Sequence, residues 1–287
     1  MSGKYVHLNG SLVAAADATI SVSDAGFLHG ASSFTTMRAH NGVVFRLATH
    51  LSRLLGTVDV LGLRTEATSE SLTAAVKELL AANKLSDARL RITLSPGDVL
   101  GGGPTVVITA EVLPEYPPAW YSEGISVSIT ELRQSPTDIA CGRKTGCYFP
   151  RILAMRTAAA KDAQEALWFT PAGHLAEGCF CNVFLRTDDE LLTPPLDTPV
   201  LDGIIRGVVM ELCDKLAIKC SDDRPLGGRD LLDADEVFMT SSCSSIRPVV
   251  RVEDHVIADG KVGPITSELM KAYNEILESE CRPEETT

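Results

Sequence analysis

Three short stretches of the chain carry residues that could do chemistry, and each borders a predicted element. Residues 144–148 (Lys-Thr-Gly-Cys-Tyr) precede a predicted helix, residues 177–184 (Glu-Gly-Cys-Phe-Cys-Asn-Val-Phe) enter a predicted strand, and residues 201–206 (Leu-Asp-Gly-Ile-Ile-Arg) open an amphipathic helix. The small and apolar neighbours of Lys144 would desolvate its ammonium and favour the neutral amine that Schiff-base formation requires.

Each of these residues, taken alone, has an ordinary structural explanation. A lone lysine such as Lys144 is usually a solvated surface charge, and a lone Glu177 is usually a surface carboxylate. Most helix starts bind only water, although the unpaired N–H groups of Ile204 and Ile205 would also suit a phosphate. Arg53 adds a cation beside the apolar stripe of a helix predicted over residues 47–61. The four features together favour a site for a phosphorylated ligand.

The composition limits the class of ligand and partner. The chain has 287 residues and a formal net charge of -12, which would repel nucleic acid and anionic lipid. Its start lacks an apolar signal core, and no stretch approaches the ~20 apolar residues of a membrane span. The eight cysteines show no paired metal-ligand spacing. We therefore expect a cytoplasmic protein with free thiols and no metal, and a phosphate site that uses few cations.

Strands and helices are predicted in separate runs rather than in strict alternation. Hairpins are expected at residues 5–13 and 34–45, around Asn9-Gly10 and Asn41-Gly42, because these dipeptides favour left-handed turns. Further strands are expected at residues 89–94, 105–112, 125–131, 166–170, 182–186 and 236–240, and helices at residues 47–61, 69–83, 149–163, 204–216 and 264–278.

This segregation predicts an α+β protein with two domains, built from mixed sheets with flanking helices. Pro114, Pro117 and Pro118 disfavour regular structure and separate two sets of elements. We therefore predict an N-terminal domain at residues 1–113, a linker at residues 114–123 and a C-terminal domain at residues 124–287.

Several motifs along nearly the whole chain carry a resemblance to a known family. They are residues 34–38 (Phe-Thr-Thr-Met-Arg), 50–54 (His-Leu-Ser-Arg-Leu), Lys144, and residues 177–184, 203–206, 238–242 and 259–264. With these motifs the chain resembles the fold-type IV pyridoxal-phosphate enzymes, the class of branched-chain and D-amino-acid aminotransferases and aminodeoxychorismate lyase. The resemblance implies a homodimer in which the C-terminal domain binds pyridoxal 5′-phosphate.

The resemblance also implies a role for each site residue. Lys144 is the Schiff-base lysine and proton shuttle, and Glu177 is the partner of the pyridine nitrogen. The implied phosphate ligands are Arg53, the backbone N–H groups of Ile204 and Ile205, and Ser242. The sequence departs from the family pattern at Ile205, which stands where threonine is common, and at Tyr148 and Phe149, which stand where asparagine and tyrosine are common. A hydrogen bond to the ring oxygen therefore comes from Tyr148 or is missing.

The substrate is less clearly specified. The residues expected to contact it are His29, Phe34, Arg38, Arg89, Arg91 and Cys243. An equally good explanation of Arg89 and Arg91 is a pair of solvated or salt-bridged strand residues. The loop at residues 95–104 lacks arginine and histidine, which disfavours a typical D-amino-acid enzyme. We expect an aminotransferase acting on a branched-chain-like or other amino acid and a 2-oxo acid; a lyase releasing pyruvate and 4-aminobenzoate, or an inactive cofactor-binding homologue, are the alternatives.

Overall fold

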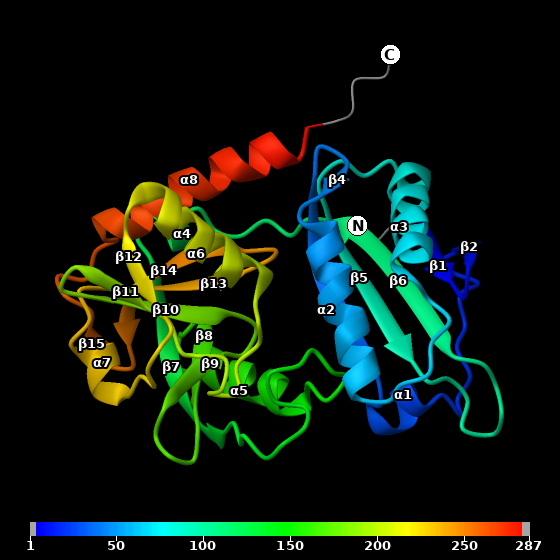
Figure 1. Ribbon diagram of the computed structural model, residues 1–287, viewed down its shortest axis with the longest axis horizontal. Helices are drawn as coiled ribbons and strands as arrows, with labels where there is room; N and C mark the ends of the chain where they lie inside the picture. The colour runs from blue at the N-terminus through cyan, green and yellow to red at the C-terminus, as the bar shows by residue number, and fades with distance from the viewer. Residues whose placement is uncertain (1–3, 283–287) are drawn as a thin grey trace. The chain divides into compact units, whose positions relative to one another are not determined.

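The structure is a computed structural model, and it describes residues 4–282 as two compact units (Figure 1). The first unit comprises the described residues up to Pro114, the short segment Lys144–Cys147 and the described residues from Ile276 onward. The second unit comprises Glu115–Arg143 and Tyr148–Glu275. Within residues 4–282, no helix is both long and apolar enough to cross a membrane.

The first unit is built on a six-stranded antiparallel sheet with the strand order β2-β1-β6-β5-β3-β4. Its strands are β1 (Tyr5–Leu8), β2 (Ser11–Ala14), β3 (Ser33–His40), β4 (Val43–Val44), β5 (Ala88–Ser95) and β6 (Thr105–Val112), and its helices are α1 (Ala25–His29), α2 (Leu47–Val60) and α3 (Ser69–Asn83). Both predicted hairpins are confirmed: Asn9 and Asn41 have φ values of 48° and 52°, and the glycine after each is also left-handed.

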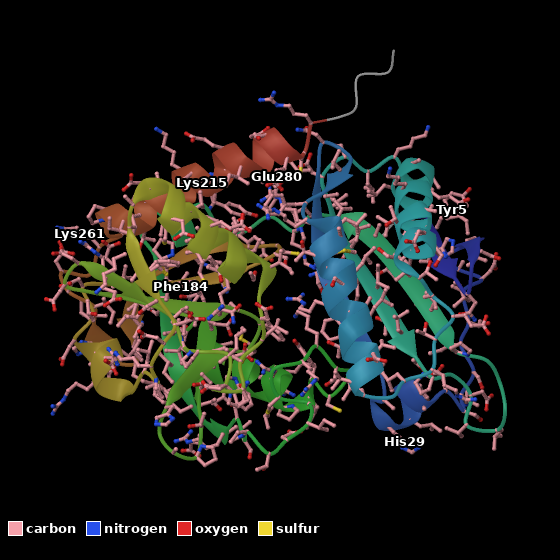
Figure 2. All side chains as sticks on the ribbon, in the orientation of Figure 1. Tyr5, His29, Phe184, Lys215, Lys261 and Glu280 are labelled. Carbon is pink, nitrogen blue, oxygen red and sulfur yellow. The ribbon has the colours of Figure 1, made fainter. Side chains whose placement is uncertain are left out.

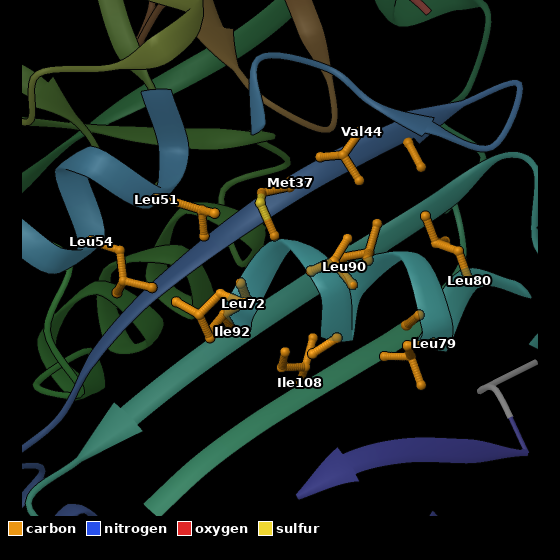
Figure 3. Packing of buried hydrophobic residues seen from close by; sticks show 14 of the residues in the cluster. Met37, Val44, Leu51, Leu54, Leu72, Leu79, Leu80, Leu90, Ile92 and Ile108 are labelled. Carbon is orange, nitrogen blue, oxygen red and sulfur yellow. The ribbon is translucent and has the colours of Figure 1, made fainter. Parts of the chain in front are cut away.

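One face of this sheet forms the core of the first unit. Alternate side chains of β3 and β5, such as Met37, Leu90 and Ile92, pack against α2 and α3 (Figure 3). Leu51 of α2 and Leu79 of α3 are fully buried in the same cluster. Because successive strand residues point to opposite faces, the polar residues between these positions are directed to the other face of the sheet.

The second unit contains a nine-stranded mixed sheet with the order β12-β11-β10-β13-β14-β7-β8-β9, and β15 pairs with β14. Its strands are β7 (Ile125–Arg133), β8 (Glu165–Phe169), β9 (Leu175–Gly178), β10 (Asn182–Thr187), β11 (Glu190–Leu192), β12 (Lys219–Ser221), β13 (Glu236–Ser241), β14 (Ser245–Val252) and β15 (His255–Val256). Its helices are α4 (Ala119–Ser122), α5 (Phe149–Ala159), α6 (Ile204–Leu216), α7 (Gly228–Leu232) and the larger part of α8 (Pro264–Glu280), whose residues from Ile276 onward belong to the first unit. At the centre, Phe184 (labelled in Figure 2) stacks on Phe238 with ring centroids 5.0 Å apart. Strand β7 runs parallel to β8 and β14, which confirms the predicted mixed α+β sheet.

Several elements of the second unit differ from the sequence-based expectation, and strands β9, β11, β12 and β15 and helix α7 are among those not predicted. Strand β14 is not predicted, although it lies between β13 and β7 and contains Pro248. The proline-rich stretch predicted as a linker contains the short helix α4. Helix α5 ends at Ala159, four residues before the predicted end at residue 163, and Asp162 beyond it adopts the left-handed region with φ 57°.

Candidate active site

The Lys144 segment is fixed in the first unit by pairing with the start of β3. The Phe34 N–H donates to the Lys144 carbonyl over 2.9 Å, and the Gly146 N–H donates to the Ser32 carbonyl over 2.8 Å. A Cβ at position 146 would lie 2.4 Å from the Ser32 hydroxyl oxygen and 2.7 Å from the Gly30 carbonyl oxygen. Glycine at position 146 therefore permits the close backbone approach that holds Lys144 beside β3.

The Lys144 side chain lies over an aromatic ring together with a second cation. Its Nζ is 5.0 Å from the centroid of the Phe34 ring, and the Arg91 guanidinium carbon is 3.5 Å from the same centroid. Arg91 also donates from Nε to the Thr93 hydroxyl over 3.0 Å, which fixes the direction of the guanidinium. The two cations on one ring form a surface suited to an anionic group such as a carboxylate.

Arg53 is connected to a buried histidine through a threonine. The Arg53 guanidinium donates to the Thr35 hydroxyl over 3.4 Å, and this hydroxyl lies 2.9 Å from His50 Nδ1. Burial lowers the pKa of His50 well below its usual value, and the charges of Arg53 and Lys144 lower it further. The Thr35 hydroxyl accepts from the Arg53 guanidinium, and it can donate to His50 Nδ1 when the neutral imidazole carries its proton on Nε2.

The other substrate residues predicted in the first unit have different surroundings. Arg89 forms an ion pair with Glu111, its cross-strand neighbour on β6, as in the salt-bridged alternative. Arg38 faces Arg89 in the β3–β5 register. His29 ends α1 and is exposed (Figure 2). Of the two β5 arginines, only Arg91 therefore lies on the ring that Lys144 contacts.

Glu177, at the end of β9, is buried and held by donors from three other segments of the second unit. Its Oε1 accepts a hydrogen bond from Arg151 over 2.6 Å and one from Gln134 over 3.1 Å. Its Oε2 accepts from the Leu201 N–H over 2.9 Å. An ionised carboxylate has about four acceptor sites, so Oε2 can accept one more hydrogen bond from a ligand.

The start of α6 has the properties of an anion site. Among the described residues, no side chain caps this helix end, and the first turn contains no acidic residue. A Cβ on Gly203 would lie 1.9 Å from Asn182 Oδ1, so the backbone passes directly against that amide. Asn182 in turn donates to the Leu201 carbonyl over 2.8 Å. The N–H groups of the following first turn are therefore held on a backbone that also contacts Glu177.

The turn after β13 holds the remaining predicted residues. Ser242 and Cys243 lie between β13 and β14, where the Ser241 and Ser244 hydroxyls are 2.7 Å apart. The Thr240 hydroxyl is buried and has no hydrogen-bond partner among the described residues, and its strand neighbour is Asn182. Buried hydroxyl groups are normally hydrogen-bonded, and a bound ligand would supply a hydrogen-bond partner here.

These features fit the cofactor that the sequence suggests. A protonated ring nitrogen would find the remaining acceptor site of Glu177, and a phosphate would find the uncapped end of α6. Leu201 joins both, since its N–H contacts Glu177 and its carbonyl contacts the Asn182 amide behind the helix start. Tyr148 stacks on Phe180 with centroids 5.7 Å apart, immediately before α5.

Comparison with known proteins decides the family. Residues 32–252 match the model of the class IV amino-transferases. The chain belongs to this family. It is 34% identical over 280 residues to a Methanocaldococcus jannaschii protein assigned as a branched-chain-amino-acid aminotransferase, covering 94% of this chain and 96% of the relative. It is 26% identical over 282 residues to the Bacillus licheniformis D-alanine aminotransferase, covering 96% and 98% of the two chains.

A solved structure agrees with this assignment. The branched-chain amino acid aminotransferase of Escherichia coli superposes with a TM-score of 0.92 at 26% identity, covering 99% of this chain and 98% of that one. The predicted fold type and the predicted aminotransferase activity are thereby confirmed. The roles of individual residues in this class IV aminotransferase stay predictions.

Sequence reasoning missed several residues that the structure of this aminotransferase places around the predicted ones. Arg151 and Gln134 contact Glu177, Thr35 contacts Arg53, and His50 contacts Thr35. A signal existed for His50, because residues three apart on a helix share a face and Arg53 follows at that spacing. The sequence holds no comparable signal for Arg151, since its contacts come from segments distant in the chain.

Proposed function

We propose that this class IV aminotransferase uses pyridoxal 5′-phosphate to transfer an amino group between a branched-chain-like amino acid and a 2-oxo acid. The observation that carries the proposal is Leu201, whose N–H contacts Glu177 and whose carbonyl is fixed three residues before the uncapped start of α6 at Ile204. This backbone connects the Glu177 carboxylate, the proposed acceptor for the ring nitrogen, with the N–H groups of the α6 start, the proposed donors for the phosphate. The names of the related proteins support the same reaction and substrate class.

The proposed catalytic residues are Lys144 and Glu177. When bound, pyridoxal phosphate is an electron sink that stabilises negative charge at the substrate α-carbon. Lys144 binds the cofactor covalently through Nζ and, as a free amine, moves the substrate α-proton. Glu177 keeps a proton on the ring nitrogen, because an ionised carboxylate is a strong acceptor for a charged N–H.

The proposed phosphate ligands combine one cation with neutral donors. Arg53 supplies the charge, and the N–H groups of Ile204 and Ile205 supply the helix-end donors. The Ser242 hydroxyl is the remaining ligand, beside the buried Thr240 hydroxyl that has no partner among the described residues. A site with a single arginine agrees with the net charge of -12.

The proposed substrate contacts follow from the surroundings of Lys144. Arg91, on the Phe34 ring, is placed to bind a carboxylate, whereas the charge of Arg89 is already paired with Glu111. Phe34 itself offers the apolar contact that an aliphatic side chain requires. The remaining predicted contacts are His29, Arg38 and Cys243.

We also propose that the protein is a homodimer. Val22, Phe27 and Leu100 of the first unit are 78%, 66% and 84% exposed, which is unusual for large apolar side chains and typical of protein interfaces. Light scattering at micromolar concentration should give twice the mass of the chain. A monomeric mass together with full activity would contradict an obligate dimer.

A spectroscopic experiment tests the cofactor assignment. The protein purified with pyridoxal phosphate should show the visible absorption band of a lysine-bound cofactor, and the Lys144→Ala variant should lack it. Lys215→Ala, which removes an exposed lysine of α6 (Figure 2), is the matched control and should keep the band. A colourless wild-type protein in the presence of excess cofactor would contradict the proposal.

A half-reaction screen tests the substrate class. Bound cofactor is followed as it converts to its amine form with branched-chain and acidic L-amino acids and with D-amino acids. We expect conversion with branched-chain L-amino acids and glutamate. Pyruvate release from aminodeoxychorismate without such conversion would instead establish the lyase.

A further inference from the structure

We propose that Arg151 is a positioning residue of this enzyme, which fixes the Glu177 carboxylate and supplies its counter-charge so that Oε2 can bind the cofactor ring nitrogen. The inference rests on the proposed function, because it assigns a purpose to the charge on Glu177. The contacts that Arg151 makes within the second unit carry the inference.

The Arg151 guanidinium is held at both of its terminal nitrogens. One nitrogen donates to the carbonyls of Gly178 and Cys179, each over 2.9 Å. The other donates to Glu177 Oε1 over 2.6 Å and to Gln134 Oε1 over 3.3 Å. Arg151 therefore binds both the carboxylate and the two carbonyls that follow it in the chain. A planar fork of donors can do this, whereas a lysine ammonium cannot match the geometry.

Two aromatic rings further fix the guanidinium. Its central carbon is 5.6 Å from the Tyr148 ring centroid and 5.4 Å from the Trp168 ring centroid. Burial, the largest single effect, would lower the pKa of Arg151, but the charge and hydrogen bond of Glu177 together with the nearby Tyr148 and Cys179 raise it. The guanidinium is thus a permanent positive charge with little freedom to move.

The direction of these bonds leaves one side of Glu177 available. Arg151 and Gln134 both donate to Oε1, and within the part of the chain that the structure describes only the Leu201 N–H donates to Oε2. The Glu177 side chain is 5% exposed, a depth at which a carboxylate without a counter-charge favours its neutral form. Loss of Arg151 would therefore replace a charge-assisted bond to the ring nitrogen with a weaker neutral one.

The first test measures binding rather than activity. Calorimetry on cofactor-free protein compares 4′-deoxypyridoxine 5′-phosphate with its deaza analogue, in which carbon replaces the ring nitrogen. Neither compound can bond covalently to Lys144, so the ratio of the two affinities reports the contribution of the ring nitrogen. In Arg151→Met we expect this ratio to fall about tenfold, the difference between a charged and a neutral hydrogen bond.

Matched variants control for general damage. Arg156→Met removes an exposed arginine from the same helix and should leave the ratio unchanged. Arg151→Lys keeps the charge but loses the fork, and should give an intermediate ratio. If Arg151→Met does not fold, the affinity ratio of Arg151→Lys is compared with that of Arg156→Met instead. An unchanged ratio in folded Arg151 variants would overturn the proposal.

A double-mutant cycle separates this inference from the proposed function. Glu177→Gln should keep the cofactor bound through Lys144 but cripple turnover. If Arg151 acts through Glu177, then Arg151→Met should have little further effect on the affinity ratio in the Glu177→Gln background. Full turnover in Glu177→Gln would refute the proposed function itself. A strong effect of Glu177→Gln with no change in folded Arg151→Met would refute the Arg151 role alone.

Discussion

A buried ion pair behind Glu177 gives a sharp prediction about stability. Glu165 and Arg247 have side chains that are 2% and 7% exposed, and the guanidinium donates to Glu165 Oε2 over 3.3 Å. Glu165 Oε1 also accepts the Cys179 N–H over 3.0 Å, two residues after Glu177. Replacing Arg247 with methionine keeps an unbranched side chain but leaves the buried carboxylate without its counter-charge. Breaking such a pair costs about 3–5 kcal/mol.

Both tryptophans of the chain, Trp120 and Trp168, lie in the second unit, so their fluorescence reports unfolding of this unit alone. With a urea dependence of about 3 kcal/mol per molar, the expected loss in Arg247→Met lowers the unfolding midpoint by about 1–2 M. Adding Glu165→Gln removes the unpaired charge and should restore part of the loss, because uncharged replacements of a buried pair are far less costly.

The control for this experiment is Arg251→Met. Arg251 lies on the same strand but donates to the Ser126 hydroxyl over 3.0 Å rather than to a buried carboxylate. It should shift the midpoint much less than Arg247→Met. Equal shifts for the two arginines, or a double variant that is less stable than Arg247→Met, would refute the reasoning about the buried charge.

Three further predictions concern the first unit. Arg53→Ala should fold but bind pyridoxal phosphate about ten- to hundred-fold more weakly, as dialysis and readdition would show; colour retained after exhaustive dialysis would exclude Arg53 as a phosphate ligand. The pKa of His50 is below its unfolded value of 6.5, so the unfolded chain binds an extra proton as pH falls through 6.5. The free energy of unfolding should then fall by up to about 1.4 kcal/mol per pH unit. In urea titrations at several pH values, a His50→Asn variant should lose this contribution to the pH dependence of stability. Asp24 accepts from the Ser95 and Thr105 hydroxyls, each over 2.6 Å, at the two ends of the β5–β6 loop. Asp24→Ala should therefore be cut faster in that loop by a protease, and an unchanged cleavage rate would contradict the anchoring role.

Elements that depend on local signals could be predicted from the sequence. The bounds of α3 and α6 agree with the predicted residues 69–83 and 204–216, because apolar spacing marks the buried face of each helix. Strand β14 could not be predicted, since Pro248 lies at its centre and lacks the N–H that a sheet normally requires. Its place in the sheet follows from pairing with β13 and β7, which no local pattern specifies.

The site was predictable only as far as its motifs reach. The motifs around Lys144, Glu177 and residues 203–206 indicate the family and the expected roles. The residues that hold Glu177 are distant along the chain: Arg151 is 26 residues away and Gln134 is 43 residues away. Contacts between such segments arise from the packing of strands and helices, and neither residue stands out by its type or spacing.

The pairing of the Lys144 segment with β3 has a consequence for synthesis of the chain. The Ser33 hydroxyl donates to the Lys144 carbonyl across 111 residues of sequence. At translation rates of about 5–20 residues per second, roughly 6–20 s separate the appearance of the two residues. During this interval the nascent β3 lacks the segment that finally covers its edge at Phe34, and open strand edges are templates for aggregation. The segment that carries the proposed catalytic lysine is thus also the last to complete the first sheet, and fragments that end before it should aggregate.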